Sequence, residues 1–161
     1  MNGDNICVIR RDVSTKAAHI AVEAAVAHGS RIGAPVAAAV VDRSGRLTAF
    51  LRSADAFLRS TDIAIDKAST AAGFRMETGA LYVMVKDNDA VLEGLRSRSG
   101  VALFGGGVPI TFEGEIIGGI GVSGGSEEQD IDCVKAGIAA MDALLTEASQ
   151  ASGEAQEVLD D

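Results

Sequence analysis

The sequence predicts an α+β fold in which a mostly antiparallel sheet is flanked by helices. Two tight-turn signals, at residues 42–45 and at residues 113–114, each separate two strand-like runs and therefore predict two β-hairpins. Helix-like segments stand before, between and after these hairpins. This order lacks the regular strand–helix–strand alternation of a parallel doubly wound sheet. The chain has 161 residues, of which 47% are apolar, and is long enough to bury the core of one such domain.

The first half of the chain predicts a helix, a hairpin and a second helix. Residues 13–28 repeat apolar residues on a helical period up to Gly29, which predicts an alanine-rich amphipathic helix. The hairpin strands are expected at residues 36–41 and 47–52. Residues 60–72 predict the second helix, because their apolar side chains recur on one helical face.

The second half predicts shorter elements and then a long helix. Ser126 and Gln129 fit a capping box, which predicts that the last helix spans residues 126–148. Residues 149–161 are small and acidic and predict a disordered tail, so that a single domain covers residues 1–148. Between the two halves we expect short helices at residues 77–85 and 87–95 and strands at residues 101–104, 110–112 and 116–122.

Residues 104–130 contain more sequence features that suggest a function than any other stretch of similar length. Gly105, Gly106 and Gly107 stand shortly before Pro109, so the backbone there can adopt φ values closed to other residues and can lie directly against a ligand. Turns and close packing alone explain the same glycines equally well. Three acidic residues in the first turn of the last helix disfavour a phosphate site at its start.

Composition and charge exclude several classes of partner. A net charge of -9 and a pI near 4.6 argue against nucleic acid and anionic membranes, because phosphate binding depends on clustered Lys and Arg. No apolar run reaches the roughly 18 residues of a membrane span, and the N-terminus lacks the apolar core of a secretion signal, so we expect a cytoplasmic protein. Cys7 and Cys133 show no metal-type spacing and are expected to be reduced. The many alanines and glycines favour thin layers with a face for self-association, and we expect a homo-oligomer.

Five segments of the sequence, in this order, resemble those of a known protein family. They are VVDRSGRL at 40–47, RSADA at 52–56, DIAIDKASTA at 62–71, FGGGVP at 104–109 and IGGIGVSGGSEEQD at 117–130. Through them most of the chain resembles the GlcG/HbpS, or haem-degrading, family, and especially the C-terminal domain of PduO-type proteins. The resemblance implies a profilin-like α+β fold, usually in a homo-oligomer, and in some members haem binding or slow haem breakdown. The adenosyltransferase activity of full PduO proteins belongs to another domain and is not expected here.

Haem binding needs a ligand to the iron, and the sequence offers two histidines. His19 lies with Lys16 and Glu23 at helical spacing, so it is either the iron ligand or a solvated side chain paired with Glu23. His28 stands at the expected helix end, where a protonated imidazole suits the helix dipole. We therefore take His19 as the candidate metal ligand for haem or a related tetrapyrrole.

Basic residues point to a bound carboxylate, which is either a haem propionate or part of a small anionic molecule. Arg52, Lys67 and Arg75 are the candidates, because a guanidinium holds a carboxylate through two parallel hydrogen bonds and an ammonium attracts it by charge. Lys67 lies in an otherwise apolar helix face, where a lowered pKa would make it a base or a nucleophile. An ion pair of Lys67 with Asp62 or Asp66 explains the same pattern.

The resemblance also extends to deaminases of amino-substituted muconates. The alternative function is therefore a hydrolytic deaminase that acts on an aminomuconate-like unsaturated dicarboxylic acid in aromatic-compound catabolism. In that enzyme Lys67 and Arg52 would hold the carboxylates while a positioned water attacks an imine carbon. A purely structural oligomer is a third hypothesis, and haem binding is the one that we favour. The general-base candidates of the deaminase are Asp42, Asp55, Asp62 and Asp66.

Overall fold

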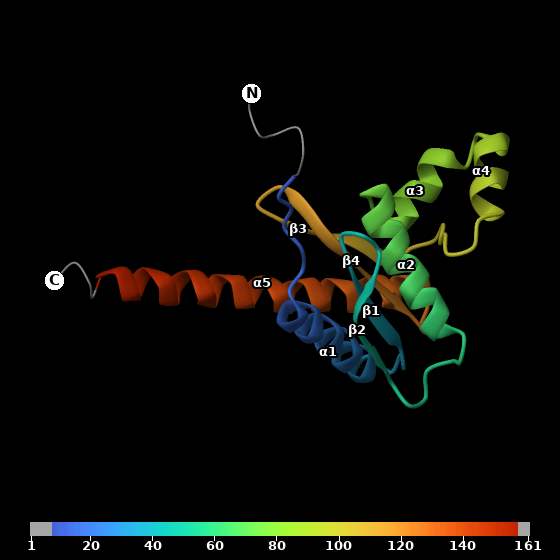
Figure 1. The fold of residues 1–161 in the computed structure, drawn as a ribbon. Coiled ribbons are helices and arrows are strands. Elements are labelled where there is room, and N and C mark those ends of the chain that lie inside the picture. The colour runs from blue at the N-terminus through green and yellow to red at the C-terminus, as the bar shows by residue number, and fades with distance from the viewer. Residues whose placement is uncertain (1–7, 158–161) are drawn as a thin grey trace, which may run out of the picture.

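A four-stranded antiparallel sheet lies between helices in the computed structural model, which describes residues 8–157 and the side chains of residues 8–144 (Figure 1). The strand order is β2-β1-β4-β3, and every neighbouring pair is antiparallel. The predicted α+β class is therefore confirmed. The strands are β1 (Ala37–Asp42), β2 (Leu47–Arg52), β3 (Gly107–Phe112) and β4 (Glu115–Ser123).

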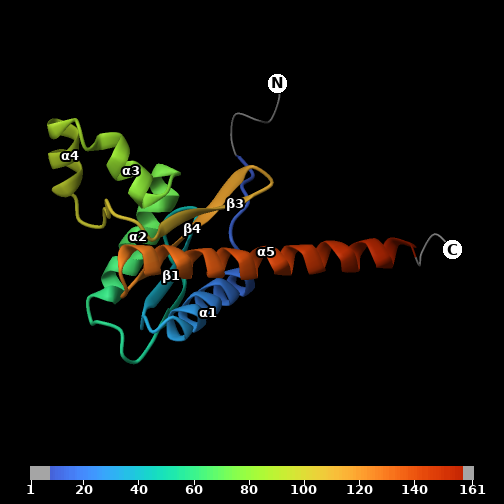
Figure 2. The same cartoon turned by 180° about the vertical axis from the view of Figure 1, so that it is seen from behind.

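Helices cover both faces of the sheet, which makes three layers. One core cluster joins α1, α5 and one face of the sheet, and a second joins α2 to the other face. Figure 2 shows that the C-terminal part of α5 projects beyond the sheet and the other helices. No helix in residues 8–157 is long and apolar enough to cross a membrane. The helices are α1 (Thr15–Arg31), α2 (Ser60–Phe74), α3 (Thr78–Val85), α4 (Asp89–Arg96) and α5 (Glu127–Glu157).

Strand β1 is buried on both faces. Ala38 and Val40 belong to the cluster with α1 and α5, whereas Ala37, Ala39 and Val41 belong to the cluster with α2. Successive side chains of a strand point to opposite faces, so a strand covered on both sides needs apolar residues at every position. This explains why the sequence here is continuously apolar instead of alternating.

Glycines in β4 let α2 lie directly against the sheet. A Cβ at Gly121 would collide with the carbonyl oxygen of Ala64, and a Cβ at Gly119 would collide with that of Ala68. Both carbonyls belong to α2. The close approach that the glycine-rich strand predicts is thus confirmed, and it brings Lys67 of α2 toward the end of β4.

The predicted turn and cap chemistry is also present. Glu113 and Gly114, between β3 and β4, both have positive φ angles of 47° and 79°, as a type I′ hairpin turn requires. At the start of α5 the Ser126 N–H donates to Gln129 Oε1 (2.9 Å), and the Gln129 N–H donates to Ser126 Oγ (3.3 Å). This is the capping box that the sequence predicts.

The predicted strand at residues 101–104 is wrong. The Ala102 N–H donates to Thr70 Oγ1 (2.9 Å), and the carbonyl of Phe104 accepts from Thr78 Oγ1 (2.6 Å). Hydroxyls of α2 and α3 thus bind backbone groups that a strand would pair with its neighbour, and β3 begins only at Gly107. The segment is a connection across the end of α2.

Helices α1 and α5 run furthest beyond their expected ends. Helix α1 continues past Gly29 to Arg31, because Gly29 is a packing position where a Cβ would lie 2.6 Å from the carbonyl oxygen of Ala34. Helix α5 continues past residue 148 to Glu157. Residues 158–161 lie outside the described part of the chain, and a disordered tail at residues 149–161 stays a prediction.

Candidate functional site

The glycine triplet forms a loop that α3 and α5 hold from two sides. Thr78, at the start of α3, donates through Oγ1 to the carbonyl of Phe104 (2.6 Å) and accepts from the Gly107 N–H (3.1 Å). Glu127, in the first turn of α5, accepts from the Gly105 N–H (2.5 Å). These side chains fix the backbone of the loop in place.

Gly106 is the position in the triplet where both the backbone conformation and the packing require glycine. Its φ angle is 104°, which side chains rarely tolerate, and a Cβ there would lie 2.8 Å from Lys67 Nζ and 2.9 Å from the carbonyl oxygen of Val122. The loop backbone therefore lies directly against the end of Lys67. On this inner side, turn geometry and close packing explain the glycines.

Lys67 is a buried cation with a complete set of contacts. Its side chain is 1% exposed, and Nζ donates to Asp130 Oδ2 (2.7 Å) and to the carbonyl of Val122 (2.9 Å). The ring of Phe104 lies over the ammonium, with its centroid 4.7 Å from Nζ. The pair links α2, the end of β4 and the start of α5.

Burial and pairing act in opposite directions on this ion pair. Desolvation lowers the pKa of Lys67 and raises the pKa of Asp130, whereas the hydrogen bond and the charge of each partner favour the ionised forms. The Gly125 N–H also donates to Asp130 Oδ1 (2.9 Å). The sequence points to Asp62 or Asp66 as the partner of Lys67, and this is wrong, because neither lies one helical turn from it on the same face.

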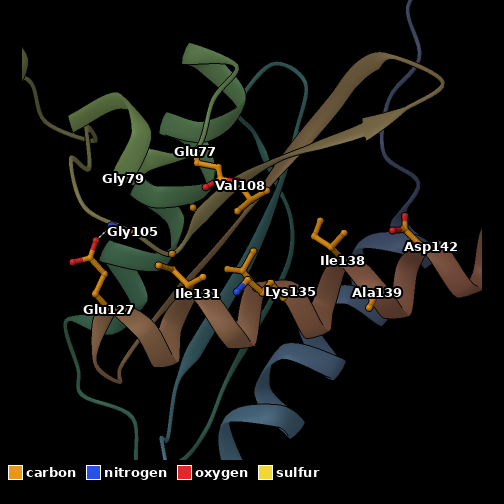
Figure 3. A pocket seen from close by; sticks show the side chains of 13 residues that line it. Glu77, Gly79, Gly105, Val108, Glu127, Ile131, Lys135, Ile138, Ala139 and Asp142 are labelled. Atoms are coloured by element: carbon orange, nitrogen blue, oxygen red, sulfur yellow. Dashed lines mark hydrogen bonds between the residues drawn. The ribbon is translucent and has the colours of Figure 1, made fainter. Parts of the chain in front are cut away.

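A groove of about 320 Å³ opens on the outer side of the glycine loop (Figure 3). Its surface is largely apolar, with Val108 of β3 and Ile131 and Ile138 of α5 among the lining side chains. The volume lies at the lower end of the range for small-molecule sites. The charged side chains that line the groove are Glu77, Glu127, Lys135 and Asp142.

The lining of the groove limits what it can bind. Three of its four charged groups are carboxylates, so it favours an apolar molecule without negative charge. Its lining residues include no His, Cys, Met or Tyr, which are the usual protein ligands of haem iron. Within the described residues no group of three or more His, Cys, Asp and Glu could hold a metal ion. Cys133 nearby is fully buried, and burial raises the pKa of its thiol to about 11, so it is a poor nucleophile.

His19 lies away from this groove, on the outer face of α1. Its side chain is 70% exposed, and its Nε2 lies 3.8 Å from Glu23 Oε2. Lys16 is exposed one turn earlier, and Ile20 and Ala24 are half-buried beside it. The pairing with Glu23 that the sequence predicts is confirmed, whereas the role of His19 as an iron ligand stays a prediction.

The other predicted ligand-binding residues do not converge on one place. Gly105, Gly106 and Gly107 line the groove, and Pro109 follows them in β3, paired with Gly119.

The basic candidates are separated from the groove and from each other. Lys67 lies behind the loop, while Arg52 donates from Nη1 to the carbonyl of Ala56 (2.7 Å). Arg75 lines a second cavity together with Arg10 and Arg43. Catalysis by Lys67 and Arg52 stays a prediction. The sequence does not single out Arg10 or Asp130, because their neighbours come from distant segments.

Comparison with known proteins gives a consistent family assignment. The profile of the family described as haem-degrading protein, HbpS-like, matches residues 13–139. The corrinoid adenosyltransferase PduO of Citrobacter freundii is 39% identical over 125 residues, a match that covers 76% of this chain and 37% of PduO. The chain thus spans little more than a third of the length of that relative.

Two solved structures share the fold over most of their length. ORFY of Klebsiella pneumoniae superposes with a TM-score of 0.81 at 28% identity, over 86% of this chain and 97% of ORFY. PduOC in complex with haem superposes with a TM-score of 0.74 at 38% identity, over 80% of this chain and 94% of PduOC. With the profile match over residues 13–139, these similarities establish that the chain belongs to the HbpS-like family of haem-degrading proteins.

Proposed function

We propose that this protein binds haem or a related tetrapyrrole on the outer face of α1, with His19 as the iron ligand. The observation that supports this most directly is the exposed imidazole. His19 is 70% exposed, and its partner among the described residues is Glu23 at 3.8 Å, an exposed ion pair that costs little to break. The similarity to PduOC, whose structure was solved with haem, adds to this support.

The residues around His19 suit a tetrapyrrole. Ile20 and Ala24 offer apolar surface, and the small side chain of Ala24 allows a flat macrocycle to approach the helix. Lys16 lies one helical turn before His19 and offers a positive charge to a propionate. Haem, when bound, supplies an iron that binds small ligands and exchanges electrons. The side chains of α1 would bind and orient it.

A haem on this face would be covered by α1 on one side of the ring only. A second copy of the chain, related by two-fold symmetry, would cover the other side and exclude water from the iron. We therefore include a homo-oligomer in the proposal. A cytoplasmic location, expected from the sequence, stays a prediction.

The deaminase alternative finds no specific support in the described geometry. The Lys67 side chain is 1% exposed and its amine is bound to Asp130, and the Arg52 guanidinium donates to the carbonyl of Ala56. Asp42, one of the base candidates, accepts from the backbone N–H groups of its own turn. No described contact joins these groups into a substrate site, so we do not carry this function further.

A haemin titration followed by absorbance tests the proposal. We expect a saturable Soret shift, near one haem per chain or per defined oligomer, and affinity at least about tenfold lower in His19→Ala, since the proposed iron ligand would be lost. His28→Ala is the matched control, because the half-buried His28 instead contacts Arg31 Nη2 through Nδ1 (3.2 Å). Unsaturable binding, no shift, or equal loss in both variants would contradict the proposal.

A further inference from the structure

Three arginines from distant segments line one cavity of about 260 Å³ beside the two hairpin turns. Arg10 precedes α1, Arg43 lies in the β1–β2 turn and Arg75 follows the last residue of α2. In a chain with a net charge of -9, this is a local excess of positive charge. The remaining lining residues are Gly114, Glu115 and Ile116 of the second hairpin.

The guanidinium groups in this cavity make no hydrogen bond with another described residue, and Arg43 forms a long ion pair with Glu115. Arg43 Nη1 is buried without a hydrogen-bond partner, and Glu115 Oε2 lies 3.7 Å away, beyond hydrogen-bond distance. The side chains of Arg10 and Arg75 have neither a hydrogen bond nor an ion pair with any other described residue. Three like charges around one cavity repel each other unless an anion lies between them.

Arg75 occupies a backbone position that normally favours glycine. It is the C-cap of α2, with a φ angle of 58° and a ψ angle of 35°, in the left-handed region. A non-glycine residue there carries backbone strain, and strained positions cluster at functional sites. The side chain of Arg75 thus stands at a position where glycine would be more stable, which points to a role for the guanidinium.

We propose that this cavity binds a small molecule through a doubly charged phosphate group. A guanidinium donates two parallel hydrogen bonds to phosphate oxygens, and the three arginines approach from three separate segments. Three guanidiniums against the carboxylate of Glu115 leave two positive charges, which match a phosphate dianion. The cavity is larger than a phosphate ion, and Ile116 offers apolar surface to the organic part of a phosphomonoester. The proposal does not depend on haem binding.

Amide NMR shifts of the full chain, in phosphate-free buffer at constant ionic strength, test the proposal. Inorganic phosphate should shift the resonances of Gly114, Glu115 and Ile116 saturably. Tighter binding of glycerol 3-phosphate would identify a phosphomonoester, and equal binding would identify free phosphate. The absence of a saturable shift, or tighter binding of malonate than of both phosphates, would overturn the proposal.

Variants of the arginines separate binding from folding. Arg75→Gly should bind phosphate at least about tenfold more weakly and yet unfold at a higher denaturant concentration, because glycine relieves the left-handed backbone. Arg10→Ala, at an exposed residue outside the helices and strands, should show a similar loss of affinity with unchanged stability. Arg59→Ala, whose surface partner is Asp62, is the control and should bind normally. Wild-type affinity in Arg75→Gly and Arg10→Ala, or an equal loss in Arg59→Ala, would refute the site.

Discussion

Lys67 and Asp130 form an ion pair in which the two side chains are only 1% and 5% exposed. Taking two charges out of water is costly, and their attraction offsets the cost only when further hydrogen bonds satisfy the remaining donors and acceptors. Here the carbonyl of Val122 and the N–H of Gly125 provide such bonds. The pair sets the position of the glycine loop against α2, and so shapes the inner wall of the groove.

Lys67→Met should lower the free energy of unfolding by about 3–5 kcal/mol, because Asp130 would stay buried without its partner. Lys135→Met is the matched control, since Lys135 pairs with Asp132 on the surface (3.6 Å) and its loss should cost less than about 1 kcal/mol. Urea denaturation measures both values.

The double variant Lys67→Met/Asp130→Leu should recover much of that loss, because no unpaired charge remains. If Lys67→Met were no less stable than Lys135→Met, the ion pair would not have the structural role assigned to it.

At the scale of elements, the contact between α2 and β4 decides where Lys67 lies. The glycines of β4 remove the side-chain layer that normally separates a helix from a sheet. Helix α2 therefore comes close enough for Lys67 to contact the carbonyl of Val122 at the end of the strand. The glycines of residues 117–122 thus help to position the Lys67–Asp130 ion pair without contributing a side chain to it.

Gly121→Ala should destabilise the protein by about 1–3 kcal/mol, because the added Cβ would collide with the carbonyl oxygen of Ala64 and push α2 away from β4. Gly94→Ala in α4 is the control. A Cβ at Gly94 meets nothing within 4 Å, so alanine should stabilise the helix by up to about 1 kcal/mol. Thermal or urea unfolding distinguishes the two, and a neutral Gly121→Ala would show that α2 is not held at this distance.

At the scale of the whole molecule, the packing of a single chain does not account for the stability of the projecting part of α5 (Figure 2). Most of the stability of a helix in a protein comes from packing of its face against other elements. The projecting turns have no described element of this chain beside them. A second copy that packs against them agrees with the homo-oligomer proposed for haem binding.

Light scattering after size exclusion should therefore give a mass that is a multiple of 16.4 kDa at micromolar concentration. The same multiple, with haemin bound in a fixed ratio to chains, should appear after haemin is added. A mass of 16.4 kDa under both conditions would show that the chain is a monomer.

The amino-acid sequence by itself determines the elements of this protein, because their signals are local. The Glu113–Gly114 turn and the capping box at Ser126 depend on neighbouring residues only, and the continuously apolar β1 follows from burial on both faces. The false strand at residues 101–104 shows the limit of such signals. Its apolar residues suit a strand, but threonine hydroxyls from two helices take its backbone hydrogen bonds.

Only the tertiary structure decides which side chains meet. Asp130 looks in sequence like one of several acids that complement the helix dipole, and it lies 63 residues from the lysine that it neutralises. Arg10, Arg43 and Arg75 come together because two hairpin turns and the end of α2 meet at one edge of the molecule. His19 is separated from the glycine loop because it lies on the exposed face of α1. Periodicity tells which face of an element is buried, but the layer that packs on that face, and so the partner of each charge, follows from long-range contacts.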